Sequence, residues 1–376
     1  MAGIYIHIPF CKQACHYCDF HFSTNLGTRH ELIGALFKEI ELQKNYLQNE
    51  VIDTIYFGGG TPSLLQAKEI ETLLNTIYSH HSVNPKAEIT LEANPDDLSK
   101  GKIQELYSLS INRLSIGIQS FEDSVLKFFN RAHHAKEAIQ CVEDARKAGF
   151  RNLSLDLIYA VPGQDHIQWM KNIEKAIQLG PEHISSYTLT IEEKTAFGKW
   201  AKAGKLKSVE EKFAAEEFEI LMNHLEEAGY EHYEISNFCR PGFQSKHNSN
   251  YWKQAKYLGI GPSAHSYNGD SRQFNVSNNA LYQQSLKKDE VPFELETLSR
   301  ENKINEYIFT TLRTSWGCDF SYLKKAFGYD LLLIQSAYLH DLTKQGLINL
   351  NQGTITLTRK GKFVADQIAL DLFLSS

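Results

Sequence analysis

The first half of the chain alternates short apolar or β-branched runs with longer segments in which apolar residues recur every three or four positions. This alternation is typical of βαβ units, which build parallel sheets. The predicted strands are Ile4–Ile8, Thr54–Phe57, Glu88–Ala93, Arg113–Ile118, Asn152–Ile158 and His183–Leu189. The clearest predicted helices are Glu31–Leu47, Ala67–Tyr78, Ala135–Ala148 and Ile167–Leu179. We therefore predict an α/β fold in which residues 1–200 form an open, partial (β/α)6 barrel.

The pattern changes after the sixth predicted strand. A charged amphipathic helix is expected over Ser208–Ala228. The aromatic stretch Tyr230–Tyr267 follows it and shows neither a helical nor a strand period. We expect residues 201–295 to form an irregular linking region that completes the core.

From about Leu298 the pattern predicts three helices, two short strands and a last helix from Lys360. The two strands, Leu347–Asn349 and Thr354–Leu357, are joined by a turn. This order of elements resembles a winged-helix domain, which we expect over residues 296–376.

Composition and charge narrow the class of protein. The chain has 376 residues, of which 42% are hydrophobic and 11% aromatic, and its net charge is −6. We find no secretion signal and no stretch of about 18 apolar residues. We therefore expect a cytoplasmic protein without a transmembrane segment, for which peripheral membrane contact stays open. The negative charge argues against nucleic acid as a ligand, and so does the balance of eight Lys and Arg to seven Asp and Glu from Glu301 onward.

Three cysteines follow the first predicted strand: Cys11, Cys15 and Cys18. Their spacing lets three thiolates on one loop hold a four-iron cluster by three corners, which leaves one iron without a protein ligand. The alternative is a zinc site in which a histidine completes the ligand set, namely His7, His16 or His21. The other three cysteines lie far apart, so no disulfide framework is expected.

Other unusual residues fall at the carboxyl ends of the predicted strands. The glycine run Gly58–Pro62 follows the second strand, and Glu92 ends the third. Gln119 follows the fourth strand and Asp156 lies late in the fifth. In parallel α/β barrels this edge carries the active site. These motifs therefore predict one site beside the cysteine loop.

The residue types at this edge suit a polar cofactor. Glycines let backbone groups approach a ligand closely. Glu92 and Asp156 are acids in apolar strands, where an unpaired carboxylate is costly. For Glu92 two explanations stay open, a buried ion pair with Arg113 or Arg131 and a hydrogen bond to a ligand. The guanidinium of Arg131 can clamp a carboxylate with two parallel hydrogen bonds.

The cysteine spacing, with Tyr17 before the last cysteine, resembles that of the radical S-adenosylmethionine (SAM) superfamily, in which SAM chelates the open iron. Longer motifs resemble the oxygen-independent coproporphyrinogen III oxidase group of that superfamily: Tyr5–Cys11, Gly58–Pro62, Glu92–Pro95, Ser115–Phe121 and Asp156–Gln164. The resemblance implies a 4Fe-4S cluster on Cys11, Cys15 and Cys18. It also implies a SAM site composed of Tyr5, Gly59, Gly60, Thr61, Glu92, Gln119, Arg131 and Asp156.

The run His247–Trp252 looks like the His-Asn-x-x-Tyr-Trp motif of the heme chaperone branch of this group. A histidine flanked by aromatic residues can offer a ring nitrogen to heme iron while the aromatic rings pack on the porphyrin. The alternative is a surface histidine with core aromatics. We expect His247 to bind heme, with His265 as the second candidate.

Two features of the true oxidases are absent from this sequence. Position 20 is Phe20 instead of a fourth cysteine, and only four residues precede Tyr5, where the oxidases carry a long covering segment. The resemblance therefore implies a chaperone that binds heme and passes it to an acceptor protein. Two alternatives remain, a SAM-radical decarboxylase of coproporphyrinogen III and a winged-helix regulator that senses the state of the cluster.

Overall fold

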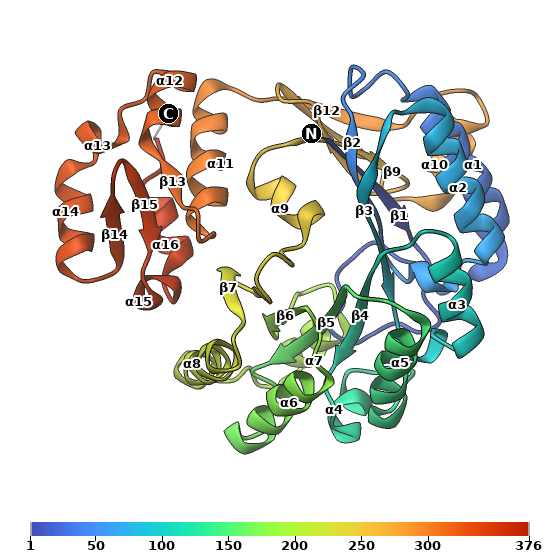
Figure 1. The fold of residues 1–376 in the computed structure, drawn as a ribbon, viewed down its shortest axis with the longest axis horizontal. Helices are drawn as coiled ribbons and strands as arrows, with labels where there is room; N and C mark the ends of the chain where they lie inside the picture. Colours follow the sequence, from blue (N-terminus) through green and yellow to red (C-terminus); the bar gives the residue numbers. More distant parts are fainter. Residues whose placement is uncertain (1, 375–376) are drawn as a thin grey trace.

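Six parallel strands, neighbours in the order of the chain, organise residues 2–374, which are the residues described in this computed structural model (Figure 1). The strands are β1 (Ala2–Ile8), β2 (Ile52–Gly59), β3 (Val83–Ala93), β4 (Arg113–Gln119), β5 (Leu153–Tyr159) and β6 (His183–Thr188). The helices that cover their outer face are α1 (Arg29–Leu42), α2 (Ala67–His80), α3 (Lys100–Ser108), α5 (Ala135–Ala148) and α6 (His166–Leu179). This arrangement confirms the predicted α/β partial barrel.

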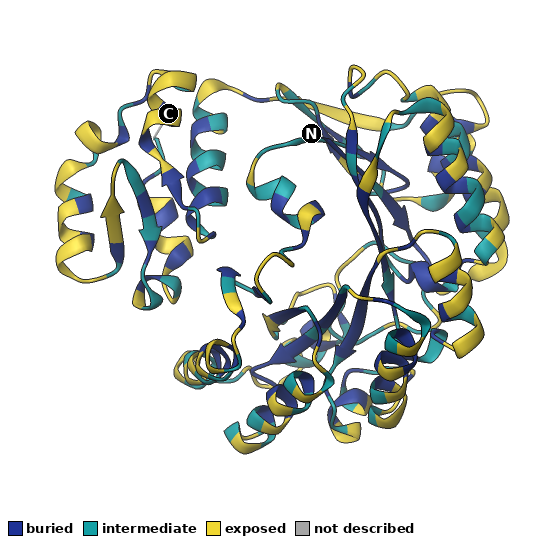
Figure 2. Cartoon of the chain, in the orientation of Figure 1, coloured by how far each residue is buried: buried dark blue, intermediate teal, exposed yellow. Residues whose placement is uncertain are grey.

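The two faces of each strand differ in chemistry. On β1, the side chains of Ile4, Ile6 and Ile8 are fully buried in the main hydrophobic core. The alternate residues, including Tyr5 and His7, face the inside of the barrel beside polar groups of β2. Figure 2 shows that burial is densest along these strands and on the helix faces toward them. The outer face therefore holds the fold together, and the inner face is free for polar chemistry.

The sheet extends beyond the six predicted strands. On one side β9 (Lys256–Ile260) pairs parallel with β1, and β10 (His265–Tyr267), β11 (Ser271–Asn275) and β12 (Phe293–Thr297) follow as antiparallel neighbours. On the other side β8 (Asn237–Cys239) and β7 (Glu231–Glu234) continue from β6. Within residues 2–374 the sheet thus has twelve strands.

These extra strands, together with α9 (Lys246–Trp252), differ from the sequence expectation of an irregular stretch over residues 230–267. Runs of three to five residues are too short to show a period of their own. They become strands because the edges of the parallel sheet offer them hydrogen-bond partners.

A buried carboxyl group ties this extension to the helical layer. Glu39 on α1 accepts hydrogen bonds from the backbone amide of Gly261 at 2.7 Å and from the Tyr282 hydroxyl at 2.5 Å. Tyr282 lies on α10 (Asn279–Leu286), and the side chain of Asn275 on β11 donates to the same carboxyl at 2.6 Å. Burial raises the pKa of Glu39 to about 7. Three donors therefore compensate a group that would be costly to bury alone.

The C-terminal domain forms its own hydrophobic core beside the open side of the barrel (Figure 1). Its helices are α11 (Arg300–Leu312), α12 (Phe320–Phe327), α13 (Leu331–Ile334), α14 (Ser336–Lys344), α15 (Arg359–Lys362) and α16 (Ala365–Asp371). A small antiparallel sheet contains β13 (Cys318–Asp319), β15 (Thr354–Leu357) and β14 (Ile348–Asn351), in that order. The predicted winged-helix-like domain is confirmed.

Hydrogen bonds join this domain to the barrel. The amide of Ser315 donates to the carbonyl of Tyr233 on β7 at 2.9 Å, and Arg272 on β11 pairs with Glu306 on α11 at 2.7 Å.

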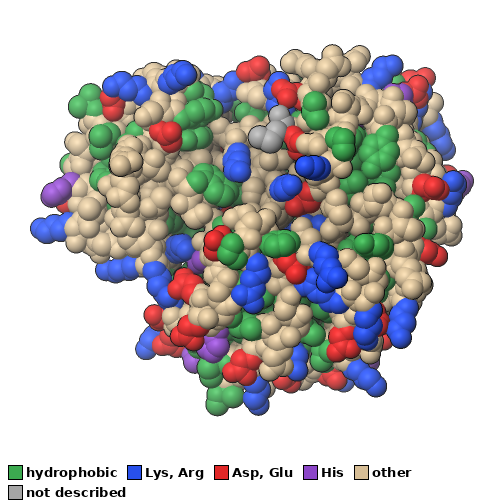
Figure 3. Space-filling view, viewed as in Figure 1, with side chains coloured by type: hydrophobic (Ala, Val, Ile, Leu, Met, Phe, Trp, Pro, Cys, Tyr) green, Lys and Arg blue, Asp and Glu red, His purple; other side chains and the backbone are tan. Residues whose placement is uncertain are grey.

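Acidic and basic side chains are interspersed over the face seen in Figure 3. Between residues 2 and 374, no helix has both the length and the apolar character needed to cross a bilayer.

Candidate functional site

A cavity of about 550 Å³ lies at the carboxyl ends of the parallel strands. Its lining includes residues from the loops after β1 and β2, from the ends of β3, β4 and β5, and from the segment after α4 (Asp123–Phe128). The predicted site residues among them are Cys11, Cys15, Cys18, Gly59, Gly60, Thr61, Glu92, Gln119, Arg131 and Asp156. The structure therefore brings together nearly all of the residues that the motifs singled out.

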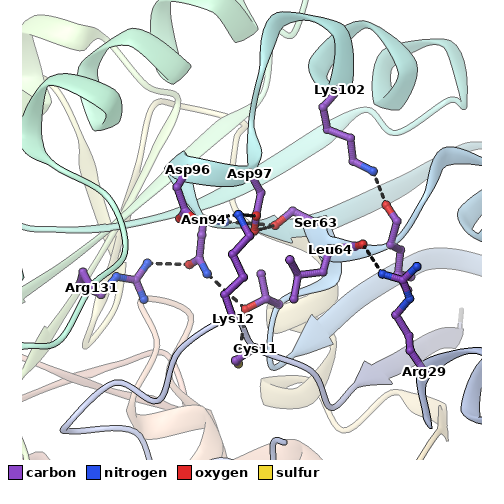
Figure 4. Close-up of polar contacts among 12 residues, drawn as sticks. Cys11, Lys12, Arg29, Ser63, Leu64, Asn94, Asp96, Asp97, Lys102 and Arg131 are labelled. Atoms are coloured by element: carbon purple, nitrogen blue, oxygen red, sulfur yellow. Dashed lines mark hydrogen bonds and ion pairs between the residues drawn. The ribbon is translucent and has the colours of Figure 1, made fainter. Parts of the chain in front are cut away.

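The cysteine loop is fastened on two sides. Lys12 binds Asp96 at 2.8 Å and also pairs with Asp97, and both carboxylates follow β3 (Figure 4). On the other side the Asn130 side chain donates to the carbonyl of Ala14 at 2.7 Å. These bonds hold a loop without secondary structure of its own against the barrel edge.

All three cysteines of the loop are free and partly buried. Burial raises the pKa values of the Cys11 and Cys18 thiols to about 11. Over residues 2–374 no three His, Cys, Asp or Glu side chains lie close enough to hold a single metal ion. The histidines of the zinc alternative bind elsewhere: His7 to the carbonyl of His21, His16 to the carbonyl of Phe128, and His21 to Asn279.

A chain of hydrogen bonds links two of the cysteines through Asn94, and Figure 4 shows the part of it from Arg131 to Cys11. The Thr61 hydroxyl donates to the Cys11 sulfur at 3.4 Å, and the Asn94 amide donates to Thr61 at 3.2 Å. Arg131 donates to the Asn94 oxygen at 2.6 Å and to the Cys15 sulfur at 3.4 Å. Sequence reasoning had placed Asn94 in a motif but had assigned it no role.

The guanidinium of Arg131 differs from the expected clamp. One terminal nitrogen binds Asn94 and the carbonyl of Gly117 at 2.7 Å, and the other faces Cys15 and Tyr17. Its Nε is buried and has no partner within the described residues. A second, parallel hydrogen bond to a carboxylate would therefore require Arg131 to give up a protein acceptor, whereas the Nε–H is ready to donate.

Glu92 accepts hydrogen bonds from the Tyr56 hydroxyl at 2.7 Å and from the Gly59 amide at 3.3 Å. In the described part of the chain Glu92 forms no ion pair with Arg113 or Arg131, so the ion-pair explanation is wrong, although the charge of Arg113 acts on its carboxyl over a longer distance. Burial raises the pKa of Glu92 to about 7, and it raises the pKa of Asp156 to about 6. The cavity therefore holds two carboxyl groups that titrate near neutral pH.

Gln119 occupies an unusual backbone conformation at the end of β4, with φ at 66°. A positive φ is uncommon for a residue with a side chain and is often found at functional sites. The cavity also includes residues to which the motifs had assigned no role. Four of them lie inside the motifs named above: Asn94, Ser115, Gly117 and Ile158. The others end or follow β6, from which no residue had been singled out: Tyr187, Thr188, Leu189, Thr190 and Glu192.

Three predicted residues lie outside the cavity. Tyr5 points into the barrel and its hydroxyl contacts His7 Nδ1 at 3.1 Å. His265 is exposed at the start of β10, where its ring packs edge-on against Phe274 with centroids 4.7 Å apart. His247 on α9 is buried, with Nδ1 bonded to Thr54 at 2.8 Å and Nε2 bonded to Tyr251 at 2.9 Å. Its imidazole is therefore not free, unlike the imidazole that the motif led us to expect.

With this geometry described, two family models match the chain. Residues 5–179 match the radical SAM superfamily, and residues 298–364 match the HemN C-terminal domain. Together with the cysteine loop and the cavity, these matches define a radical SAM protein.

Relatives that match almost the whole chain identify the family within this superfamily. The chain is 35% identical to the heme chaperone HemW of Bacillus subtilis over 98% of both chains. It is also 35% identical to the heme chaperone HemW of Lactococcus lactis over 97% of both chains. The chain belongs to the HemW family of radical SAM proteins.

The fold is also that of a solved structure, coproporphyrinogen III oxidase (HemN) from Escherichia coli. The TM-score is 0.86 at 22% identity, and the match covers 99% of this chain and 90% of HemN. At this identity the likeness concerns the fold alone.

Gly60 also has a structural role, beside the SAM contact that the resemblance implies for it. A Cβ at this position would lie 2.7 Å from the carbonyl oxygen of Phe10 and 2.8 Å from that of Ile8. The Gly60 amide also donates to the Ile8 carbonyl at 2.9 Å. The glycine is thus required where the β2 loop presses against the base of the cysteine loop.

We expect Gly60→Ala to destabilise the protein by about 1–3 kcal/mol, because rigid backbone atoms occupy the space of the new methyl group. Denaturant unfolding of the metal-free protein measures this change. Gly34→Ala on α1, where a Cβ would meet nothing within 4 Å, is the matched control and should be neutral or slightly stabilising. Equal stability of Gly60→Ala and the parent would contradict the close contact.

Proposed function

We propose that the protein is a radical SAM heme chaperone that binds heme and transfers it to an acceptor protein. The observation that carries this proposal is the similarity to HemW proteins over 97–98% of the chain, which spans the cysteine loop, the cavity and the C-terminal domain. The proposal includes a cytoplasmic location, because an iron–sulfur cluster needs a reducing compartment.

The cavity residues fit a 4Fe-4S cluster and SAM. Three free thiols on one fastened loop face the cavity, and the unpartnered Nε of Arg131 suits the SAM carboxylate. Glu92 and the backbone of Gly59 and Gly60 suit the SAM amino group, and Gln119 and Asp156 suit the ribose hydroxyls. When bound, a reduced cluster with one open iron supplies an electron to SAM.

Heme is the cargo in this proposal, and His247 is its first candidate ligand. Ligation through Nε2 requires the hydrogen bond to Tyr251 to break and the buried ring to become accessible, so heme binding would be coupled to a rearrangement around α9. His265 needs no such movement, because it is exposed and has no hydrogen-bond partner in the described structure. The two histidines therefore predict different responses to heme.

A parallel assay of heme uptake and coproporphyrinogen III consumption tests the proposed function. We expect the anaerobically reconstituted protein, with about four irons per chain, to bind about one heme, to pass it to apomyoglobin and to leave coproporphyrinogen III unchanged in the presence of SAM. His247→Ala should shift the Soret band and weaken heme binding, whereas His265→Ala should do neither. Turnover of coproporphyrinogen III without heme uptake would assign the protein to the oxidases instead.

The hydrogen bonds from Thr61 and Arg131 to the cysteine sulfurs predict the redox behaviour of the cluster. Donors to sulfur stabilise the reduced cluster, so their loss lowers its potential. We expect Asn94→Ala, which removes the residue that orients both donors, to lower the midpoint potential by roughly 20–60 mV, the one-electron equivalent of one hydrogen bond.

Redox titration followed by absorbance measures this shift. Asn130→Ala is the matched control, because Asn130 also anchors the cysteine loop but donates to a backbone carbonyl and not to sulfur. An unchanged potential in Asn94→Ala, with iron content equal to that of the parent, would show that the link through Asn94 does not tune the cluster.

A further inference from the structure

His247 lies in the interior of the barrel, and both its backbone and its side chain are fixed there. Its side chain is 2% exposed. The amides of Lys246 and His247 donate to the carboxylate of Glu88 on β3 at 3.2 and 3.1 Å. On β1, a Cβ at Gly3 would come within 3.2 Å of the His247 ring, so the glycine leaves room for the imidazole. Glu88 and Gly3 therefore accommodate His247 as a buried residue.

The imidazole stacks on Tyr56 of β2. The two ring centroids are 4.9 Å apart and the planes are inclined by 26°. Tyr5 on β1 packs against the same pair, 6.1 Å from Tyr56 and 6.3 Å from His247. The rings of three separate elements therefore form one cluster beneath the cavity, and they limit the positions that Tyr56 can adopt.

Tyr56 connects this ring cluster to the cavity. Its hydroxyl donates to Glu92 at 2.7 Å, and Glu92 lines the cavity. A Cβ at Gly58 would lie 2.8 Å from the Tyr5 ring, 3.0 Å from the Tyr56 ring and 3.2 Å from the Glu92 carboxyl. The close packing of these three side chains thus depends on the absence of a side chain at position 58.

We propose that His247 is a positioning residue for the SAM site: its ring holds Tyr56, and the Tyr56 hydroxyl holds the Glu92 carboxylate toward the cofactor. The inference rests on the SAM-binding part of the proposed function and not on heme. We therefore expect His247 to affect the affinity for SAM even in protein that contains no heme.

The hydroxyl of Tyr56 also favours the ionised form of Glu92, because a donor stabilises the charged carboxylate. Burial already raises the pKa of Glu92 to about 7, and the Tyr56 hydrogen bond opposes this rise. Arg113 on β4 lowers the pKa of Glu92, and Asp156 on β5 raises it. The phenols that face Glu92 from other elements are Tyr5 on β1, Tyr187 on β6 and Tyr251 on α9.

Tyr56→Phe removes the hydroxyl and keeps the ring. The pKa of Glu92 should rise further, so a larger share of the free protein carries a protonated Glu92 at neutral pH. For a rise of about one pKa unit, SAM binding should weaken about fivefold at pH 7 and by less than about twofold at pH 9. Calorimetric titration of SAM into reconstituted, heme-free protein at several pH values measures how the difference in affinity between variant and parent shrinks as the pH rises. A general structural defect would not produce this dependence on pH.

Tyr282→Phe is the matched control. Tyr282 donates to the buried Glu39 at 2.5 Å, so the variant loses the same chemical group in another tyrosine–glutamate pair outside the cavity. Its SAM affinity should equal that of the parent at every pH.

Two variants of His247 separate positioning from heme ligation. His247→Ala removes the ring, so it should weaken SAM binding as Tyr56→Phe does. His247→Phe keeps a ring against Tyr56 and should restore most of the SAM affinity, although neither variant can ligate iron.

Parent-like SAM affinity across the pH range in either Tyr56→Phe or His247→Ala, at equal iron content, would overturn the proposal. If His247→Ala does not fold, His247→Leu, which fills the space but offers Tyr56 no ring to stack on, replaces it in this comparison. A parent protein that binds no SAM would instead refute the SAM-binding part of the proposed function.

Discussion

The close contact between Gly60 and the backbone of Ile8 and Phe10 determines where the cysteine loop can lie. The loop leaves β1 at this point and has no regular secondary structure, so its position depends on what it packs against. Once it rests on the β2 loop, Thr61 reaches Cys11 and Arg131 reaches Cys15. The geometry of the thiols therefore follows from a contact that only a glycine permits.

The barrel and the location of the site could be predicted because a pattern within short stretches of the sequence indicates each of them. Six apolar runs separated by helical periods predict parallel strands, and parallel strands place their carboxyl ends along one edge. Cys11, Gly59, Glu92, Gln119 and Asp156 each follow or end such a run, so their convergence required no knowledge of side-chain contacts.

What could not be predicted depends on partners that are distant in the sequence. The strand β9 exists because β1 has a free edge, and nothing in five residues of sequence reveals this. Arg131 was expected to clamp a ligand, but one of its terminal nitrogens binds Asn94 and Gly117 and the other faces Cys15 and Tyr17. His247 looked free because a motif records neighbours along the chain, whereas Thr54 lies 193 positions away.

Burying the charged and polar groups of the cavity costs free energy, and a ligand that pairs with them can offset this cost. Glu92 and Asp156 are buried together, and burial raises the pKa values of both toward neutral pH. Arg131 lines the same space, and its buried Nε has no partner in the described residues. The SAM that we propose for this cavity, a zwitterion with hydroxyl groups, would supply partners for all three.

We propose that Cys11, Cys15 and Cys18 hold a four-iron cluster with one iron open toward the cavity. Electron paramagnetic resonance of the reduced, reconstituted protein, recorded with and without SAM, tests this proposal. We expect the signal of a 4Fe-4S cluster and a change in its g-values when SAM is added, because the open iron gains ligands. A cluster signal that SAM leaves unaltered, or stoichiometric zinc in place of reconstitutable iron, would contradict it.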